Sequence, residues 1–152
     1  MRIDYALTLP PERSPSEVKD VLARLRSHCM DQPFESVGPL RNRLPARSDR
    51  TQAFDLKPNH VVGFWCLVPG GTLDLALYRF PKFRGTTIPW AHEHFVTLDC
   101  EAPAWTARYS AIISTFEMAA RLGMGVDVED PCGFHKHHSR ERLIKLRRIM
   151  DI

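Results

Sequence analysis

Residues 60–80 read HVVGFWCLVPGGTLDLALYRF, and this stretch decides the fold class. Its first part, residues 60–68, is apolar and rich in the β-branched and aromatic residues that favour strands. Its last part, residues 72–80, alternates apolar and polar side chains, which indicates a strand with one buried face. Pro69-Gly70-Gly71 separates the two parts and is typical of a tight turn. The stretch therefore predicts a β-hairpin.

Toward the N-terminus, the pattern predicts a strand followed by a helix. Residues 3–9 alternate in the manner of a half-buried strand, and two prolines follow them. Ser14-Pro15-Ser16-Glu17 combines a capping serine, an early proline and a capping-box glutamate. We therefore expect a helix that starts there and ends near Met30. A short extended stretch is expected around residues 34–40.

Toward the C-terminus, the pattern predicts a strand, a long helix, a short strand and a last helix. Residues 92–100 alternate, and Pro103 begins the long helix. Val126 and Val128 belong to the short strand, and Ser139 can cap the last helix. The long helix carries a wide apolar stripe made of Trp105, Tyr109, Ile112, Ile113, Phe116 and Ala120.

The order of these elements predicts the architecture. It runs strand, helix, strand, hairpin, strand, helix, strand, helix. Two strand-helix-strand units that flank an inserted β-hairpin predict an α+β protein, either ferredoxin-like or a related two-layer sandwich, with helices on one face of the sheet. The chain has 152 residues, of which 43% are hydrophobic and 26% charged. We therefore expect residues 1–152 to form a single domain with one core.

The composition also sets the compartment that we expect. No apolar run approaches the roughly 18–20 residues that span a bilayer, and the N-terminus lacks the apolar stretch of a secretory signal. The four cysteines are widely spaced and form no Cys-x-x-Cys pair, which favours reduced, buried thiols over disulfides. These features predict a cytoplasmic protein with no membrane partner.

Two segments carry a resemblance to a known family. They are the opening Ile3-Asp4-Tyr5 and the segment Leu122-Gly123-Met124-Gly125-Val126-Asp127-Val128-Glu129-Asp130. They resemble a family of small uncharacterised bacterial α+β proteins, in which a similar Gly-Val-x-Val-x-Asp strand follows the second long helix. Residues 90–100 depart from the pattern of that family. The resemblance implies an α+β fold and no particular activity.

The histidines carry the strongest chemical signal. His92 and His94 lie two apart in an expected strand and so project from one face, where they could bind zinc through their ring nitrogens. A hydrolytic zinc site needs a third protein ligand, which His135, His137 or His138 could supply. The alternative is that the late histidines form a solvated cap and that the first two bond to nearby backbone.

Arginines gather in a segment that we expect to be a mobile loop, residues 41–52. Arg41, Arg43, Arg47 and Arg50 could bind an anion or the phosphates of a nucleic acid. The net charge of +3 is small for a strongly basic nucleic-acid binder. The alternative is therefore a solvated loop without a partner.

The sequence contains no Gly-x-Ser-x-Gly, His-Glu-x-x-His or phosphate-binding glycine loop. For that reason we favour a small binding or regulatory domain that acts through an unidentified small molecule or protein partner. One alternative is a metal-dependent or histidine-based hydrolase that uses His92 and His94. The other is nucleic-acid contact through residues 41–50, with Trp65 and Trp90 as candidate stacking platforms.

Overall fold

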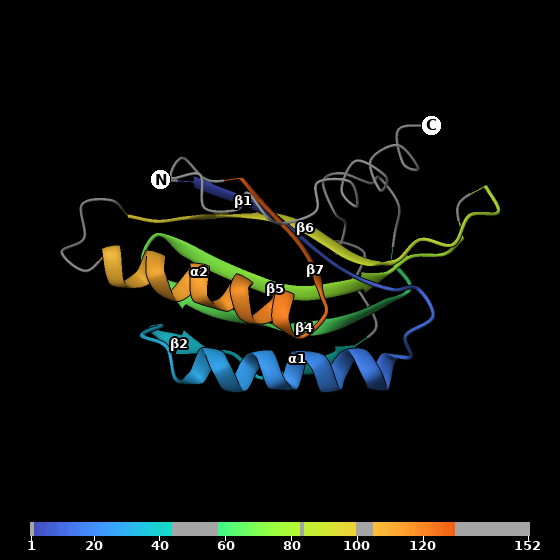
Figure 1. Ribbon diagram of the computed structural model, residues 1–152, viewed down its shortest axis with the longest axis horizontal. Coiled ribbons are helices and arrows are strands. Elements are labelled where there is room, and N and C mark those ends of the chain that lie inside the picture. The colour runs from blue at the N-terminus through green and yellow to red at the C-terminus, as the bar shows by residue number, and fades with distance from the viewer. Residues whose placement is uncertain (1, 44–57, 83, 100–104, 130–152) are drawn as a thin grey trace.

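The computed structural model describes residues 2–43, 58–82, 84–99 and 105–129 (Figure 1). Among these residues, one helix follows the first strand and a second helix follows the sixth. In chain order the elements are β1 (Arg2–Leu9), α1 (Pro15–Met30), β2 (Ser36–Val37), β3 (Arg41–Arg43), β4 (His60–Val68), β5 (Gly71–Arg79), β6 (Trp90–Thr97), α2 (Trp105–Arg121) and β7 (Gly125–Glu129).

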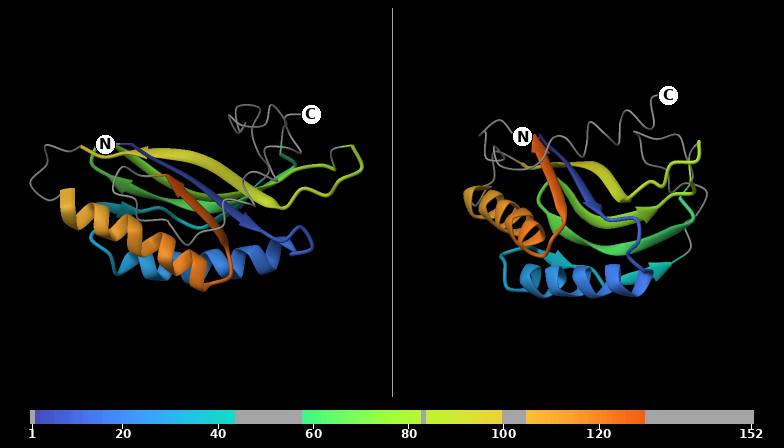
Figure 2. Two further views of the ribbon diagram at one scale, coloured as in Figure 1. Left: turned by 45° about the horizontal axis from the view of Figure 1, so that its top comes forward. Right: turned by 45° about the vertical axis from the view of Figure 1, so that its right-hand side comes forward.

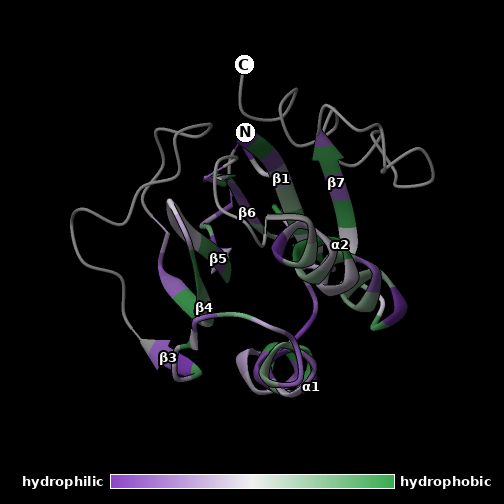
Figure 3. Ribbon diagram, turned by 90° about the vertical axis from the view of Figure 1, so that its left-hand side faces the viewer, coloured by the Kyte–Doolittle hydropathy of each residue, from purple (hydrophilic) through white to green (hydrophobic). Residues whose placement is uncertain are grey.

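The strands in the described part of the chain form one antiparallel sheet. The strand order is β2-β4-β5-β6-β1-β7, and β3 also pairs with β4. The helices α1 and α2 lie on the same side of this sheet (Figure 2). The sheet curves around that side, so that β3 and β7 lie at opposite ends of the arc (Figure 3). The protein is therefore α+β, with both described helices in one layer.

The helix α1 begins as the sequence predicts. The Ser14 hydroxyl accepts a hydrogen bond from the Glu17 N–H at 3.2 Å, and Pro15 occupies the first turn. The face of the helix that packs on the sheet is fully buried and consists of Val18, Leu22, Leu25 and Cys29.

The strands β4 and β5 form the predicted hairpin. They pair along their whole length, from His60↔Arg79 to Val68↔Gly71. Gly70 has a φ of 91° in the turn, a conformation that costs glycine little. Alternation directs one set of side chains toward the helices, and these are Val62, Phe64, Cys66, Val68, Leu73, Leu75 and Leu77. We call this side of the sheet the helix face and the opposite side the outer face.

The helix α2 completes the core over the helix face. Phe116 and Ile112 are fully buried, and the Phe116 ring lies 5.0 Å from the ring of Tyr5 on β1. Ile113 is buried and Tyr109 packs against the core, so these members of the predicted stripe are confirmed. The side chain of Trp105 lies outside the described residues.

The expectation of a loop over residues 41–52 is wrong at its start, because Arg41–Arg43 forms the strand β3. Arg41 pairs with Gly63 and Asn42 pairs with Val62. This pairing with a long neighbouring strand overrides the weak local preference of an Arg-Asn-Arg sequence for β-structure. The remainder of the expected loop, residues 44–52, lies outside the described residues, as does the expected last helix.

The strands β5 and β6 are joined differently from the hairpin. Tyr78↔Ala91 is the one bridge pair between them in the described chain. Farther along, the Tyr5 hydroxyl donates to the Asp74 carbonyl oxygen at 2.8 Å and accepts from the Asp74 N–H at 2.9 Å. A side chain from β1 thus takes the place of a backbone partner in the seam between β5 and β6.

Candidate binding pocket on the outer face of the sheet

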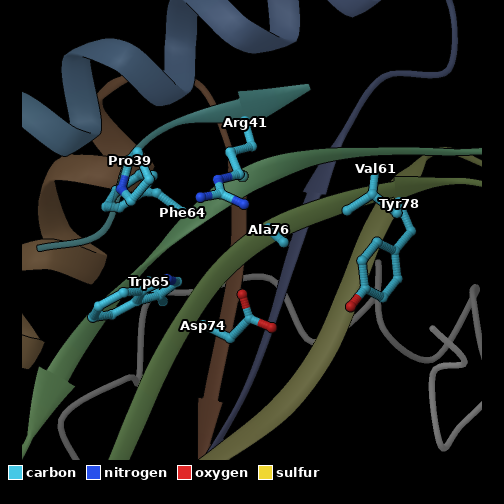
Figure 4. A pocket seen from close by; sticks show the side chains of 9 residues that line it. Pro39, Arg41, Val61, Phe64, Trp65, Asp74, Ala76 and Tyr78 are labelled. Atoms are coloured by element: carbon cyan, nitrogen blue, oxygen red, sulfur yellow. The ribbon is translucent and has the colours of Figure 1, made fainter. Parts of the chain in front are cut away.

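A pocket of about 410 Å³ lies on the outer face, over β3, β4 and β5 (Figure 4). This volume falls within the range of small-molecule sites. The described residues that line the pocket are Pro39, Arg41, Val61, Gly63, Phe64, Trp65, Asp74, Ala76 and Tyr78.

The floor of the pocket is made of small residues. Gly63 on β4 lies directly opposite Ala76 on β5. A Cβ placed on Gly63 would lie 2.3 Å from the Cα of Ala76, so no larger residue fits without moving one of the strands. The result is a low, flat floor at the centre of the hairpin.

Aromatic side chains stand at the two ends of this floor. The register places Trp65 beside Asp74 at one end and Val61 beside Tyr78 at the other. Trp65 is 40% exposed, which is unusual for a tryptophan on a folded strand. Its ring is packed against Gly38, where an added Cβ would lie 2.4 Å from the indole. The backbone therefore supports the indole while part of it stays accessible.

Two opposite charges project into the same space. Figure 4 shows the guanidinium of Arg41 and the carboxylate of Asp74 turned toward each other across Ala76. Arg41 comes from β3 and Asp74 from β5, so β4 separates their backbones. Among the described residues, none forms an ion pair or hydrogen bond with the Arg41 guanidinium, a group whose planar donors match the oxygens of an anion.

Asp74 is held in place by two residues from neighbouring strands. Tyr5 bonds both backbone groups of Asp74, and burial raises the pKa of the Tyr5 phenol well above its ordinary value. The phenol therefore stays protonated and keeps its donor. The Nε2 atom of His92 lies 3.5 Å from the Asp74 carboxylate, and the His92 ring packs edge-on against Tyr78 at 4.7 Å.

His92 is a buried, neutral imidazole. It is 3% exposed, and burial, followed by the nearby His94, lowers its pKa from 6.5 to about 3. Within the described part of the chain, neither ring nitrogen has a hydrogen-bond partner of ordinary geometry, because the 3.5 Å separation from the Asp74 carboxylate is too long. Burial and Arg2 likewise lower the pKa of His94. At neutral pH, both rings are therefore uncharged.

The structure brings together only some of the histidines that the sequence offers as ligands. His92 and His94 have ring centroids 5.5 Å apart. The candidates for the third zinc ligand, His135, His137 and His138, lie outside the described residues. Within the described ranges, no group of three or more histidine, cysteine, aspartate or glutamate side chains is arranged to hold a metal ion.

The arginines of the predicted anion site divide in the same way. Arg41 lines the pocket, whereas Arg43 contributes its backbone to β3 and its side chain is not described. Arg47 and Arg50 lie outside the described residues. The arginine cluster therefore stays a prediction, and Arg41 is the member that the structure places at a cavity.

Sequence reasoning missed the role of Asp74, although a signal was present. A two-residue turn at Pro69-Gly70 fixes the hairpin register and pairs Trp65 with Asp74. An exposed aromatic beside a carboxylate on one face of an otherwise apolar hairpin could therefore have been read from the sequence. Of the two candidate stacking platforms, Trp65 is accessible and Trp90 is fully buried.

The described lining of the pocket offers groups that can recognise a ligand by charge and stacking. It contains no serine, threonine or cysteine. Cys29 and Cys66 are both free and buried within the core on the helix face, as expected for reduced thiols. Cys100 and Cys132 lie outside the described residues.

Comparison with other proteins adds no relative. No family model matches the chain, and neither a curated protein nor a solved structure matches it. The resemblance noted in the sequence therefore stays a prediction. Among the described helices, none combines the length and apolar character that crossing a membrane requires.

Proposed function

We propose that the protein is a small binding domain whose ligand occupies the pocket between Arg41 and Asp74. The observation that carries this proposal is the presence of two opposite charges on either side of a floor of small residues. A guanidinium and a partly accessible indole line the same pocket, and both groups are suited to holding a ligand by charge and stacking. The ligand that these groups suit is a flat molecule with an anion at one end and an N–H donor at the other.

The hydrolase alternative has less support. A general base at neutral pH works best with a pKa near 7, whereas the pKa of His92 is about 3. The imidazole is better suited to fixing the Asp74 carboxylate than to taking a proton from water. A zinc site using His92 and His94 would need a third ligand from residues outside the described ranges.

We also propose that the centre of the fold is ferredoxin-like. The order β5-β6-β1-β7 supports this, because β6 lies between β1 and β5, and β1 lies between β6 and β7. With α1 after β1 and α2 after β6, this order is consistent with two split β-α-β units. The strand β4, together with β2 and β3 beside it, would then be an addition next to β5, and an experimental structure would test the strand order.

A panel of small flat molecules tests the binding function. The probes are 4-aminobenzoate, benzoate and aniline, which keep the ring and carry both end groups, the anion alone or the amine alone. Succinate serves as the anion without a ring. Binding is followed by NMR through the indole N–H of Trp65, assigned with Trp65→Phe. Trp90 is the matched reference because its indole donates to the Arg13 carbonyl oxygen at 2.9 Å and is buried.

The expected result is that 4-aminobenzoate shifts the Trp65 resonance in a saturable way, while the Trp90 resonance does not move. Benzoate and aniline should bind more weakly because each lacks one of the two end groups that the pocket would recognise. The proposal is wrong if none of the ring compounds shifts Trp65, or if Trp65 and Trp90 shift equally.

A further inference from the structure

The shape of the pocket limits the ligand to a flat body. Three residue pairs follow one another on the outer face of the hairpin, from Trp65↔Asp74 through Gly63↔Ala76 to Val61↔Tyr78. At about 3.4 Å per residue, the two end pairs lie about 13 Å apart. Between them the floor rises no higher than the methyl group of Ala76. A planar ring can lie on this floor, with Trp65 at one end as a stacking partner.

The opposite charges of Arg41 and Asp74 suit a ligand that carries a different group at each end. Arg41 and Asp74 are two strands apart, which corresponds to about 10 Å between backbones. A guanidinium matches a phosphate or carboxylate through two parallel hydrogen bonds. A carboxylate in the position of Asp74 accepts from ring N–H or amino groups, as acidic side chains do with the edges of nucleobases.

Asp74 is held in position before a ligand binds. Tyr5 fixes its backbone by two hydrogen bonds, and His92 stands 3.5 Å from its carboxylate. A carboxylate with a fixed backbone loses less conformational freedom on binding than one on a mobile loop. The acidic end of the pocket is therefore the end that can select the ring.

We infer that the ligand is a nucleotide, with its phosphate on Arg41, its base against Trp65 and the N–H groups of the base on Asp74. This inference rests on the proposed binding function and names the class of ligand. A pocket of about 410 Å³ is large enough for a mononucleotide. The same chemistry is presented by a free nucleotide and by one nucleotide of a single strand.

Calorimetric titration of the full chain tests the inference. The ligands are AMP, CMP and GMP, with adenosine as the compound lacking phosphate and ribose 5-phosphate as the compound lacking a base. A single-stranded oligodeoxyadenylate represents the polymer. The variants are Arg41→Gln, Trp65→Leu and Asp74→Asn. Arg24→Gln, which alters an exposed arginine of α1, is the matched control.

At least one mononucleotide or the oligonucleotide should bind, with adenosine and ribose 5-phosphate each about tenfold weaker or more, because each lacks one of the two groups that the pocket recognises. Arg41→Gln should weaken nucleotide binding by about tenfold and leave adenosine binding unchanged. Asp74→Asn should weaken adenosine binding and leave ribose 5-phosphate binding unchanged. Arg24→Gln should bind as the unaltered protein does.

Binding of the oligonucleotide that exceeds that of AMP, falls with salt and depends on Arg41 assigns the source to single-stranded nucleic acid. Tighter binding of a mononucleotide assigns it to the free compound. The inference is overturned if nucleotides bind no better than ribose 5-phosphate, or if Arg41→Gln and Trp65→Leu, both altered at accessible positions, change nothing. If 4-aminobenzoate binds and no nucleotide does, the inference is wrong while the binding function stands. If neither binds, both are wrong.

Discussion

The two sides of β5 are held in opposite ways. On the β4 side, backbone pairs run without interruption from His60↔Arg79 to Val68↔Gly71. On the β6 side, the described strands share the bridge pair Tyr78↔Ala91, and Asp74 bonds a side chain instead of a strand. The first side provides a rigid floor for the pocket. The second side frees the backbone of Asp74 from the ladder and ties it to Tyr5.

This difference explains how a charged group comes to be fixed beside a small-residue floor. In a complete ladder, Asp74 would be positioned by β6 alone, and Tyr5 and His92 would have no access to it. In the seam, residues of β1 and β6 reach across to Asp74 from strands that do not line the pocket themselves. The seam thus connects the buried core with the outer face.

The largest effect is expected from removing the core support of Tyr5. The Phe116 ring is fully buried and lies 5.0 Å from the Tyr5 ring. Phe116→Ala should lower the free energy of unfolding by about 3–5 kcal/mol, because it leaves a cavity. Urea unfolding measures this loss. Met30→Ala is the control, since Met30 is 60% exposed, and a Phe116→Ala variant as stable as this control would refute the packing.

Gly63→Ala tests the close pairing of β4 with β5. The added methyl would lie 2.3 Å from the Cα of Ala76, so the strands must shift apart. We expect a loss of about 1–3 kcal/mol in the free energy of unfolding, together with weaker binding of 4-aminobenzoate. Thermal unfolding and NMR titration measure the two effects. Unchanged stability would show that β4 and β5 approach less closely than described.

Tyr5→Phe tests the seam between β5 and β6, where the Tyr5 hydroxyl bonds to Asp74. The substitution keeps the ring against Phe116 and removes both hydrogen bonds to Asp74. Leaving these backbone groups without a partner should cost about 1–3 kcal/mol. Hydrogen exchange gives a local readout, in which the Asp74 amide loses protection while the Leu75 amide keeps it. Equal protection of Asp74 in both proteins would mean that the phenol is not its partner.

His92 gives the seam a dependence on pH. Burial lowers the pKa of His92 from 6.5 to about 3, so the unfolded chain takes up a proton at a higher pH than the folded protein does. The contribution of His92 to stability is complete above about pH 6.5 and is lost as the pH falls toward 3, by at most about 1.4 kcal/mol per pH unit. Between pH 7 and pH 5, the free energy of unfolding measured with urea should fall less for His92→Gln than for the unaltered protein. If the free energy of unfolding changes equally with pH in both proteins, the His92 ring is exposed to solvent rather than buried.

Much of the fold could be predicted from the sequence because its signals are local. The turn at Pro69-Gly70, the cap at Ser14 and the apolar stripe of α2 each act within a few residues, and each appears in the structure. The strand β3 could not be predicted, since Arg41–Arg43 is extended only because β4 lies beside it. The pattern of residues adjacent in the sequence does not reveal a pairing partner that is distant along the chain.

The candidate site was predictable only in part for the same reason. Alternation directed attention to His92 as a site candidate, yet its contact with Asp74 depends on the seam between β5 and β6. The hydrogen bonds between Tyr5 and Asp74 join residues that are 69 positions apart. The local sequence around either residue does not predict this contact. The Trp65↔Asp74 pair was within reach, because the turn alone fixes it.

The most direct test of the account is a titration of 4-aminobenzoate into the unaltered protein, Arg41→Gln and Asp74→Asn, followed through the Trp65 indole N–H. The account predicts that each substitution weakens binding about tenfold, since each removes the partner of one end of the ligand. Arg24→Gln should bind as the unaltered protein does, and the Trp90 resonance should stay in place throughout. A Trp65 shift of the same size and midpoint in all four proteins, or no shift in any of them, would contradict the claim that this pocket is the binding site.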